Sequence, residues 1–113
     1  MAIKIGTGNT RILTVIAVEP CHPRNIEHKI EVEFNKLPMS VWSAHKTNET
    51  PVNTLLPDNC VIKTQICGDN DEPLSQQELL DISFIERALI LGFSAVQEGI
   101  TNDQYLKARI KNS

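Results

Sequence analysis

The sequence predicts an α+β fold, with a small antiparallel sheet of three to five strands packed on a long C-terminal helix and a short terminal helix. Three observations support this prediction. The 113 residues fit one domain spanning 1–113. In the first two-thirds of the chain, apolar residues recur at every second position, the period of a strand. In the last third they recur three and four positions apart, the period of a helix.

Segment 10–18 is predicted to be a central strand. Its apolar residues lie on both faces, which is typical of a strand covered on both sides. Pro20 and Pro23 follow, and proline cannot donate a hydrogen bond to a sheet ladder. The strand is therefore expected to end near Val18.

Segment 26–34 carries the clearest strand pattern. Apolar residues alternate with charged ones, so one face is expected to pack and the other to meet water, as in an antiparallel sheet. Further strands are expected at 41–43 and 61–66, with the polar, proline-containing segment 47–59 as a loop between them. The inward-pointing residues of the clearest strand are Ile26, His28, Ile30, Val32 and Phe34.

A long helix is predicted over residues 76–98. It begins at a capping box, in which Ser75 and Glu78 satisfy backbone amides at the helix start. The helix is apolar around most of its circumference, so it must be covered on more than one side. The sheet can cover one side. We expect a second copy of the chain to cover the other, giving a dimer or higher oligomer, unless the chain's own last helix does so.

The chain after this helix is predicted to turn and form a short helix over 103–110. Gly99 is expected to end the long helix in a left-handed conformation, and Thr101 with Gln104 to cap the next one. Tyr105 and Leu106 can then fold back on the long helix, together with Ile110.

Charge and composition exclude two classes of partner. The net charge is −3, and 11 basic residues are scattered among 14 acidic ones, so binding to DNA or RNA is not expected. No signal peptide and no apolar run of membrane-spanning length is visible, which predicts a cytoplasmic protein without a membrane partner. The cysteines at 21, 60 and 67 are expected to be reduced thiols there.

Metal and catalytic chemistry find little support in the spacing of residues. Cys21, His22 and His28 lie close together but lack the pairing that zinc requires, so neither a metal nor a cofactor is expected. A thiol nucleophile activated by an imidazole would combine Cys21 or Cys60 with His45. Nothing in the sequence orients such a pair, and the chain is predicted not to be an enzyme.

The few arginines are the candidate ligand-binding residues. Arginine recognises phosphate through a bidentate fork. Arg24 lies in a predicted turn, Arg87 on the long helix and Arg109 near the C-terminus. If subunits meet, residues from such places can converge on one small anionic ligand.

Two resemblances extend these predictions. Segment 96–106, with Gly99, Ile100 and Thr101 at its centre, looks like the helix–Gly–Ile–Thr–helix turn of short bacterial oligomerisation modules. The layout of a small sheet followed by C-terminal helices is similar to the phage anti-Thoeris sponge proteins. That resemblance implies a phage-encoded oligomer that sequesters a cyclic ADP-ribose-type immune signal without cleaving it. It also implies that Arg109 contacts the anion and Phe93 the base.

Together these interpretations predict a non-enzymatic homo-oligomer that sequesters a small anionic or cyclic-nucleotide signal and so blocks host defence. Two alternatives stay open. One is a protein–protein adaptor or inhibitor, or a minor phage structural protein. The other is a small enzyme that depends on Cys21, Cys60, His28 or His45.

Overall fold

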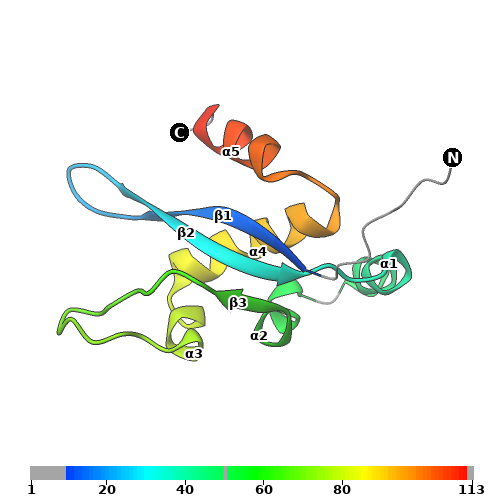
Figure 1. Ribbon diagram of the computed structural model, residues 1–113, viewed down its shortest axis with the longest axis horizontal. Helices are drawn as coiled ribbons and strands as arrows, with labels where there is room; N and C mark the ends of the chain where they lie inside the picture. Colours follow the sequence, from blue (N-terminus) through cyan, green and yellow to red (C-terminus); the bar gives the residue numbers. More distant parts are fainter. Residues whose placement is uncertain (1–9, 50, 112–113) are drawn as a thin grey trace, which may run out of the picture.

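A computed structural model describes residues 10–49 and 51–111, with side chains described through Ala108. The α+β prediction is confirmed: over the described residues, three antiparallel strands form one sheet in the order β1-β2-β3, accompanied by helices (Figure 1). The elements in chain order are β1 (Thr10–Glu19), β2 (Ile26–Asn35), α1 (Met39–Thr47), the 3-10 helix η1 (Val52–Thr54), α2 (Leu56–Asn59), β3 (Cys60–Ile62), α3 (Gln76–Leu80), α4 (Ser83–Gln97) and α5 (Asn102–Lys111).

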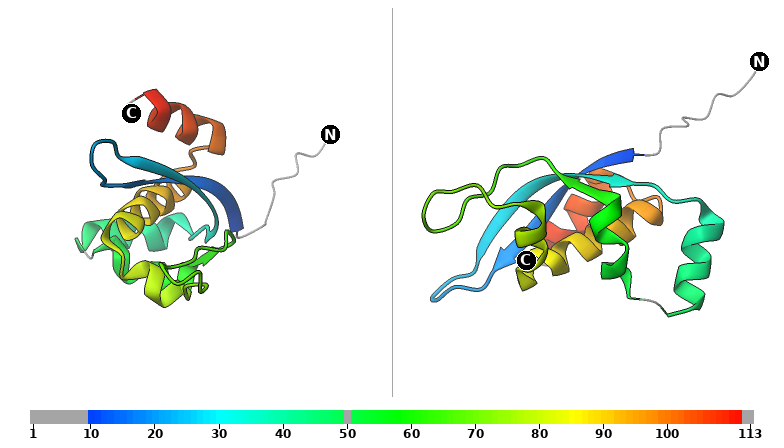
Figure 2. Two further views of the ribbon diagram at one scale, coloured as in Figure 1. Left: turned by 90° about the vertical axis from the view of Figure 1, so that its left-hand side faces the viewer. Right: turned by 90° about the horizontal axis from the view of Figure 1, so that it is seen from below.

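β1 is an edge strand, so the prediction that it is central was wrong. Over residues 10–49 and 51–111 it pairs with β2 alone, and β2 lies in the middle of the sheet. Its apolar residues are nevertheless covered, because α4 packs beneath the sheet and α5 lies along the outer side of β1 (Figure 2). Val15 is fully buried and Ile16 is only 3% exposed. Helices that cover an edge strand in this way produce the same apolar pattern on both faces as the burial of a central strand.

A glycine lets α4 lie close against the sheet. A Cβ atom at Gly92 would come within 3.0 Å of Val15 Cγ2 and 3.2 Å of Leu13 Cδ2 and Phe34 Cζ. Those distances are too short for an unstrained methyl group in a close-packed core. The small residue at 92 therefore serves packing within the chain.

The predicted helix over 76–98 is two helices. The capping box at Ser75 is confirmed, because its hydroxyl accepts from Glu78 N while Glu78 Oε1 accepts from Ser75 N. The helix then ends at Leu80, and Ile82 has extended backbone with φ −91° and ψ 116°. This bend lets both Leu79 and Ile85 reach the core from helices with different directions.

The expectations for 41–43 and 47–59 were wrong. Residues 41–43 lie inside α1, where Trp42 alone turns into the core, and the supposed loop contains η1 and α2. Prolines start all three helices: Pro38 and Pro51 occupy N-cap positions, and α2 has Pro57 in its first turn. The beginning of a helix needs no amide donor from such residues, so proline is tolerated there.

The predicted strand 61–66 is shorter than expected. β3 ends at Ile62, and the following residues run as an irregular segment in which Cys67 and Pro73 form an isolated bridge. This segment, residues 64–74, is called the crossing segment below because it runs alongside the far half of the β1–β2 hairpin.

The chain itself covers most of α4. η1, α2 and α3 pack on the side of α4 that does not face β1, so Leu89 and Phe93 are fully buried. Leu91 is 45% exposed and is the largest apolar surface that α4 leaves open. Self-association through this helix stays a prediction, but the apolar circumference of the helix no longer requires it.

α5 packs mainly against β1, whereas the prediction placed it on the long helix. The predicted caps are confirmed. Gly99 has φ +77°, and Thr101 exchanges hydrogen bonds with Gln104. Tyr105 is buried beside β1, with its hydroxyl accepting from Ile16 N at 3.3 Å. The side chain of Ile110 lies outside the described residues.

Candidate functional site

The predicted arginines and Phe93 do not share a site in the described part of the chain. Arg24 is exposed in the β1–β2 loop, and Arg87 is exposed on α4. Phe93 is completely buried, with edge-to-face contacts to Phe34 and Trp42. In this position it fills the core and lines none of the clefts in the described part of the chain. Arg109 belongs to α5, and its side chain lies outside the described residues.

A cleft of about 620 Å³ lies where the β1–β2 hairpin extends beyond the end of β3. β3 pairs only with 32–34 of β2, so the part of β2 before that has no strand on this side. The crossing segment and the start of α4 take the place of the missing strand and leave a hollow between them. We call this hollow the hairpin cleft. Figures 1 and 2 show the hairpin and the crossing segment projecting from the same end of the molecule.

His28 is held in a defined orientation within the hairpin cleft. Its Nε2 lies 2.8 Å from Oε1 of Glu19, which reaches across the hairpin from β1. The imidazole also stacks on Phe84, in the first turn of α4, with ring centroids 6.2 Å apart. A ring fixed by a carboxylate and by an aromatic face presents its remaining edge in one direction, which favours directional recognition of a ligand.

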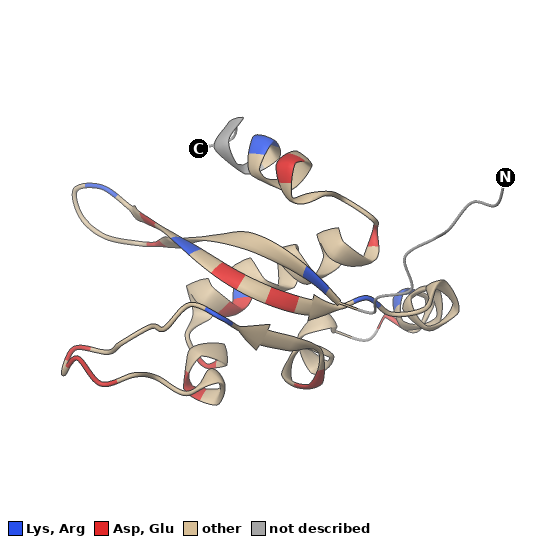
Figure 3. Ribbon diagram, in the orientation of Figure 1, with Lys and Arg blue, Asp and Glu red and all other residues tan. Residues whose placement is uncertain are grey.

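The hairpin cleft combines an apolar floor with a polar rim, which is typical of small-molecule sites. The rim is acidic overall, because carboxylates at 19, 27 and 69 outnumber the ammonium of Lys29. Figure 3 shows acidic residues on both the hairpin and the tip of the crossing segment. The apolar lining consists of Ile30, Ile66, Leu74, Ile82, Phe84 and Ile85.

Sequence reasoning found part of this site. The alternation of 26–34 placed His28 among the inward-pointing residues, but Glu19 lies just after Val18, where the first strand was expected to end. The strand register puts His28 opposite Ala17 and Ile26 opposite Glu19, so Glu19 and His28 are diagonal neighbours on one face. A hairpin register counted back from the loop could have revealed this pair.

The structure separates the two predicted thiol nucleophiles: Cys60 begins β3, and Cys21 lies in the loop between β1 and β2. Cys60 is buried, and burial raises the pKa of its thiol to about 11, which disfavours the reactive thiolate. The loop with Cys21 lies at the opposite end of the sheet from α1, which carries His45 (Figure 1). The His45 ring stacks on Trp42 at 5.8 Å, and its buried Nε2 has no hydrogen-bond partner within the described residues.

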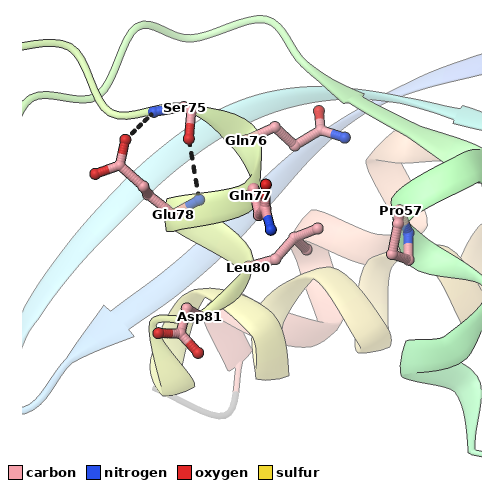
Figure 4. A pocket seen from close by; sticks show the side chains of 7 residues that line it. All are labelled: Pro57, Ser75, Gln76, Gln77, Glu78, Leu80 and Asp81. Atoms are coloured by element: carbon pink, nitrogen blue, oxygen red, sulfur yellow. Dashed lines mark hydrogen bonds between the residues drawn. The ribbon is translucent and has the colours of Figure 1, made fainter.

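A groove between α2 and α3 is wide and shallow. It has a volume of about 770 Å³, and part of its wall is the helix start at Ser75, whose cap bonds with Glu78 appear in Figure 4. Pro57 and Leu80 supply its apolar surface. Three of the polar side chains along this wall are used within the chain, since Ser75, Gln76 and Glu78 all bond to other protein atoms.

A basic groove of about 410 Å³ borders the C-terminal end of α4. Lys36 and Arg11 line it, and Lys36 Nζ donates to Gln97 O at 2.7 Å. Cations at the C-terminal end of a helix stabilise its free carbonyl groups and its dipole. This role within the fold accounts for the basic character of the groove.

Over residues 10–49 and 51–108, no group of three or more metal-binding side chains comes together. None of the described helices is both long enough and apolar enough to cross a membrane. The described residues thus form a small α+β domain in which the hairpin cleft is a ligand-sized hollow that contains an oriented histidine. Comparisons with protein-family models, curated proteins and solved structures found no match.

Proposed function

We propose that this chain is a non-enzymatic binding protein that holds a small ligand in the hairpin cleft. The observation that carries the proposal is His28, fixed between Glu19 and Phe84 inside a hollow of about 620 Å³. Ligand pockets commonly have volumes of about 300–1,000 Å³. The cleft offers one ring edge for a directional hydrogen bond and an apolar floor for a planar group.

The charge of the rim favours a neutral or cationic ligand. Three carboxylates against one ammonium give a negative potential, which repels a phosphate group. Arg24 and Arg87, proposed as anion contacts, do not line this cleft. Sequestration of an anionic or cyclic-nucleotide signal therefore stays a separate proposal that needs a site elsewhere, and the hairpin cleft lends it no support.

Binding can be tested by amide chemical-shift titration of the full chain. The probes are adenosine and tryptamine as neutral and cationic planar compounds, with AMP as the anionic counterpart. We expect shifts concentrated at His28, Thr64 and Phe84 for adenosine or tryptamine, and none there for AMP. If neither adenosine nor tryptamine shifts these amides at millimolar concentration, the proposal fails. Mass spectrometry of the recovered probe should find it intact, and turnover would exclude the non-enzymatic part.

A pair of variants on α4 localises the binding. Phe84→Ala removes the stacking partner of His28, whereas Leu91→Ala trims an exposed side chain outside the cleft. We expect at least tenfold weaker binding for Phe84→Ala and unchanged binding for Leu91→Ala. Since Phe84 also packs against the core, His28→Gln provides a second variant with less effect on packing. Equal affinity in all three variants would place the ligand elsewhere.

A further inference from the structure

We propose that the free edge of β1 is a self-association surface for a second copy of this chain, and that α5 covers it in the monomer. The proposal does not depend on the ligand proposed for the hairpin cleft. It rests on three observations: the hydrogen-bonding groups that β1 directs away from the sheet, the way α5 covers them, and the charges of β1.

β1 directs alternate backbone groups away from the sheet. Thr14 lies opposite Glu31, whose carbonyl accepts from Lys63 N on the far side of β2. In an antiparallel ladder such a pair exchanges no hydrogen bonds, so the amide and carbonyl of Thr14 point outward. By the same alternation, the backbone amides and carbonyls of Ile12, Ile16 and Val18 also point away from the sheet. β1 therefore presents a row of groups that another strand could pair with.

The described residues of α5 cover the middle of this row. Asn102 Oδ1 accepts from Thr14 N at 2.8 Å, and the Tyr105 hydroxyl accepts from Ile16 N at 3.3 Å. Both contacts engage amides, and within the described residues no side chain of α5 donates to an outward carbonyl of β1. Tyr105 is the one fully buried side chain among those described in α5. The cover is thus a helix held by few contacts.

Apolar surface remains open around the covered part. Ile12 on β1 is 54% exposed, and Ile100, just before α5, is 41% exposed. Beyond Ile16, a groove of about 260 Å³ runs between the strand and α4, with Val18, Arg87 and the exposed Leu91 among its lining residues. A second copy on this edge would cover the exposed side of α4 as well, the helix for which self-association was predicted.

The charges of β1 match a second copy of the same strand. Its only charged residues are Arg11 and Glu19, each four positions from Val15 and of opposite sign. In an antiparallel pairing with Val15 opposite Val15, Arg11 of one copy faces Glu19 of the other at both ends. The same register places Thr14 opposite Ile16, so the outward-pointing backbone amides and carbonyls of the two copies face each other. Hydrogen bonding and charge therefore select one isologous register.

α5 and the second copy compete for the amides of Thr14 and Ile16, so weakening α5 should produce dimers. The test is sedimentation equilibrium of the full chain carrying Asn102→Ala and Tyr105→Ala. We expect a dimer dissociation constant at least tenfold lower than that of the wild type. Lys107→Ala, which changes an exposed α5 residue, is the matched control and should behave as the wild type.

The register is tested by exchanging charges in the Asn102→Ala, Tyr105→Ala background. Arg11→Glu should weaken the dimer at least tenfold, and adding Glu19→Arg should restore it. A folded Asn102→Ala, Tyr105→Ala protein that stays monomeric at millimolar concentration overturns the proposal, and failure of the charge exchange to restore pairing overturns the register. If the Asn102→Ala, Tyr105→Ala protein does not fold, the single variant Tyr105→Phe tests the proposal instead. Its Ile16 amide should exchange faster than in the wild type when dilute and regain protection when concentrated, and no regain overturns the proposal.

Discussion

The two edges of the sheet are closed by side chains from helices, but in different ways. At β3, Gln76 supplies both kinds of group: its Nε2 donates to Cys60 O at 2.9 Å, and its Oε1 accepts from Ile62 N at 3.1 Å. At β1, the described residues of α5 supply acceptors only. An amide side chain can thus stand in for a peptide of a neighbouring strand, whereas acceptors alone can pair only with the amides of an edge strand.

The helices that carry these side chains also differ in their anchoring. α3 is fastened by buried Leu79 and by the capping box at Ser75, and α4 follows it after only two residues. α5 is attached through the turn at Gly99 and buries Tyr105. The β3 edge is therefore expected to stay closed, while the β1 edge can open.

Gln97 bonds to backbone groups at and just after the end of β2, as Gln76 does at β3, but in the interior of the protein. Its side chain is completely buried, with Oε1 accepting from Leu37 N and Nε2 donating to Asn35 O, both at 2.7 Å. Gln97→Leu should cause the largest loss, about 2–5 kcal/mol of unfolding free energy, since two backbone groups lose their partners without gaining water. Urea denaturation measures it. Gln77→Leu, on an exposed surface, is the control, and similar losses in both would refute the assigned role of Gln97.

Gln76→Ala tests the β3 edge directly. Its contacts are partly buried, so we expect a loss of about 1–2 kcal/mol in unfolding free energy without any change in oligomeric state. Gln77→Ala, one position along the same helix, should change stability by less than about 0.5 kcal/mol. Dimerisation of Gln76→Ala would show that the β3 edge, and not only the β1 edge, is open to self-pairing.

Glu98 provides the smallest and the only pH-dependent effect of this series. Its carboxylate accepts from Trp42 Nε1 and Lys46 Nζ, both at 3.0 Å. The bond from Trp42 comes first among the causes that lower its pKa, followed by the bond and charge of Lys46. A lowered pKa in the folded state stabilises the protein above the unfolded value of 4.5, and this contribution is lost as the pH falls through the folded value.

Thermal denaturation of the wild type and Glu98→Gln between pH 3 and pH 7 measures this contribution. The stability difference between the two proteins should shrink as the pH falls. Gln76 and Gln97 do not titrate, so variants at those positions should differ from the wild type by a constant amount over the same range. A difference for Glu98→Gln that is independent of pH would contradict the assigned role of the carboxylate.

Much of the architecture could be predicted because its signals are local. The alternation of 26–34, the capping box at Ser75 and the left-handed turn at Gly99 each depend on residues a few positions apart, and each is present in the structure. α1 was missed because residues 41–43 were interpreted as a strand, and η1 and α2 were missed because the prolines of 47–59 were interpreted as loop signals.

The candidate site was less accessible to sequence reasoning. His28 was recognised as inward-pointing, but its neighbours Glu19 and Phe84 come from a different strand and from a helix 56 residues away. Phe93 was selected by resemblance and lies in the core. Which side chains share a cleft depends on strand register and helix placement, and neither is a property of one segment.

By itself, the sequence determined the α+β class, the two long strands, the starts of α3 and α5 and the turn at Gly99, because period and capping act between near neighbours. Only the tertiary structure decided that β1 is an edge, that Gln76 and α5 close the two edges, and that Glu19 meets His28. Those outcomes depend on contacts between segments far apart in the chain, and equal local patterns are compatible with several such arrangements.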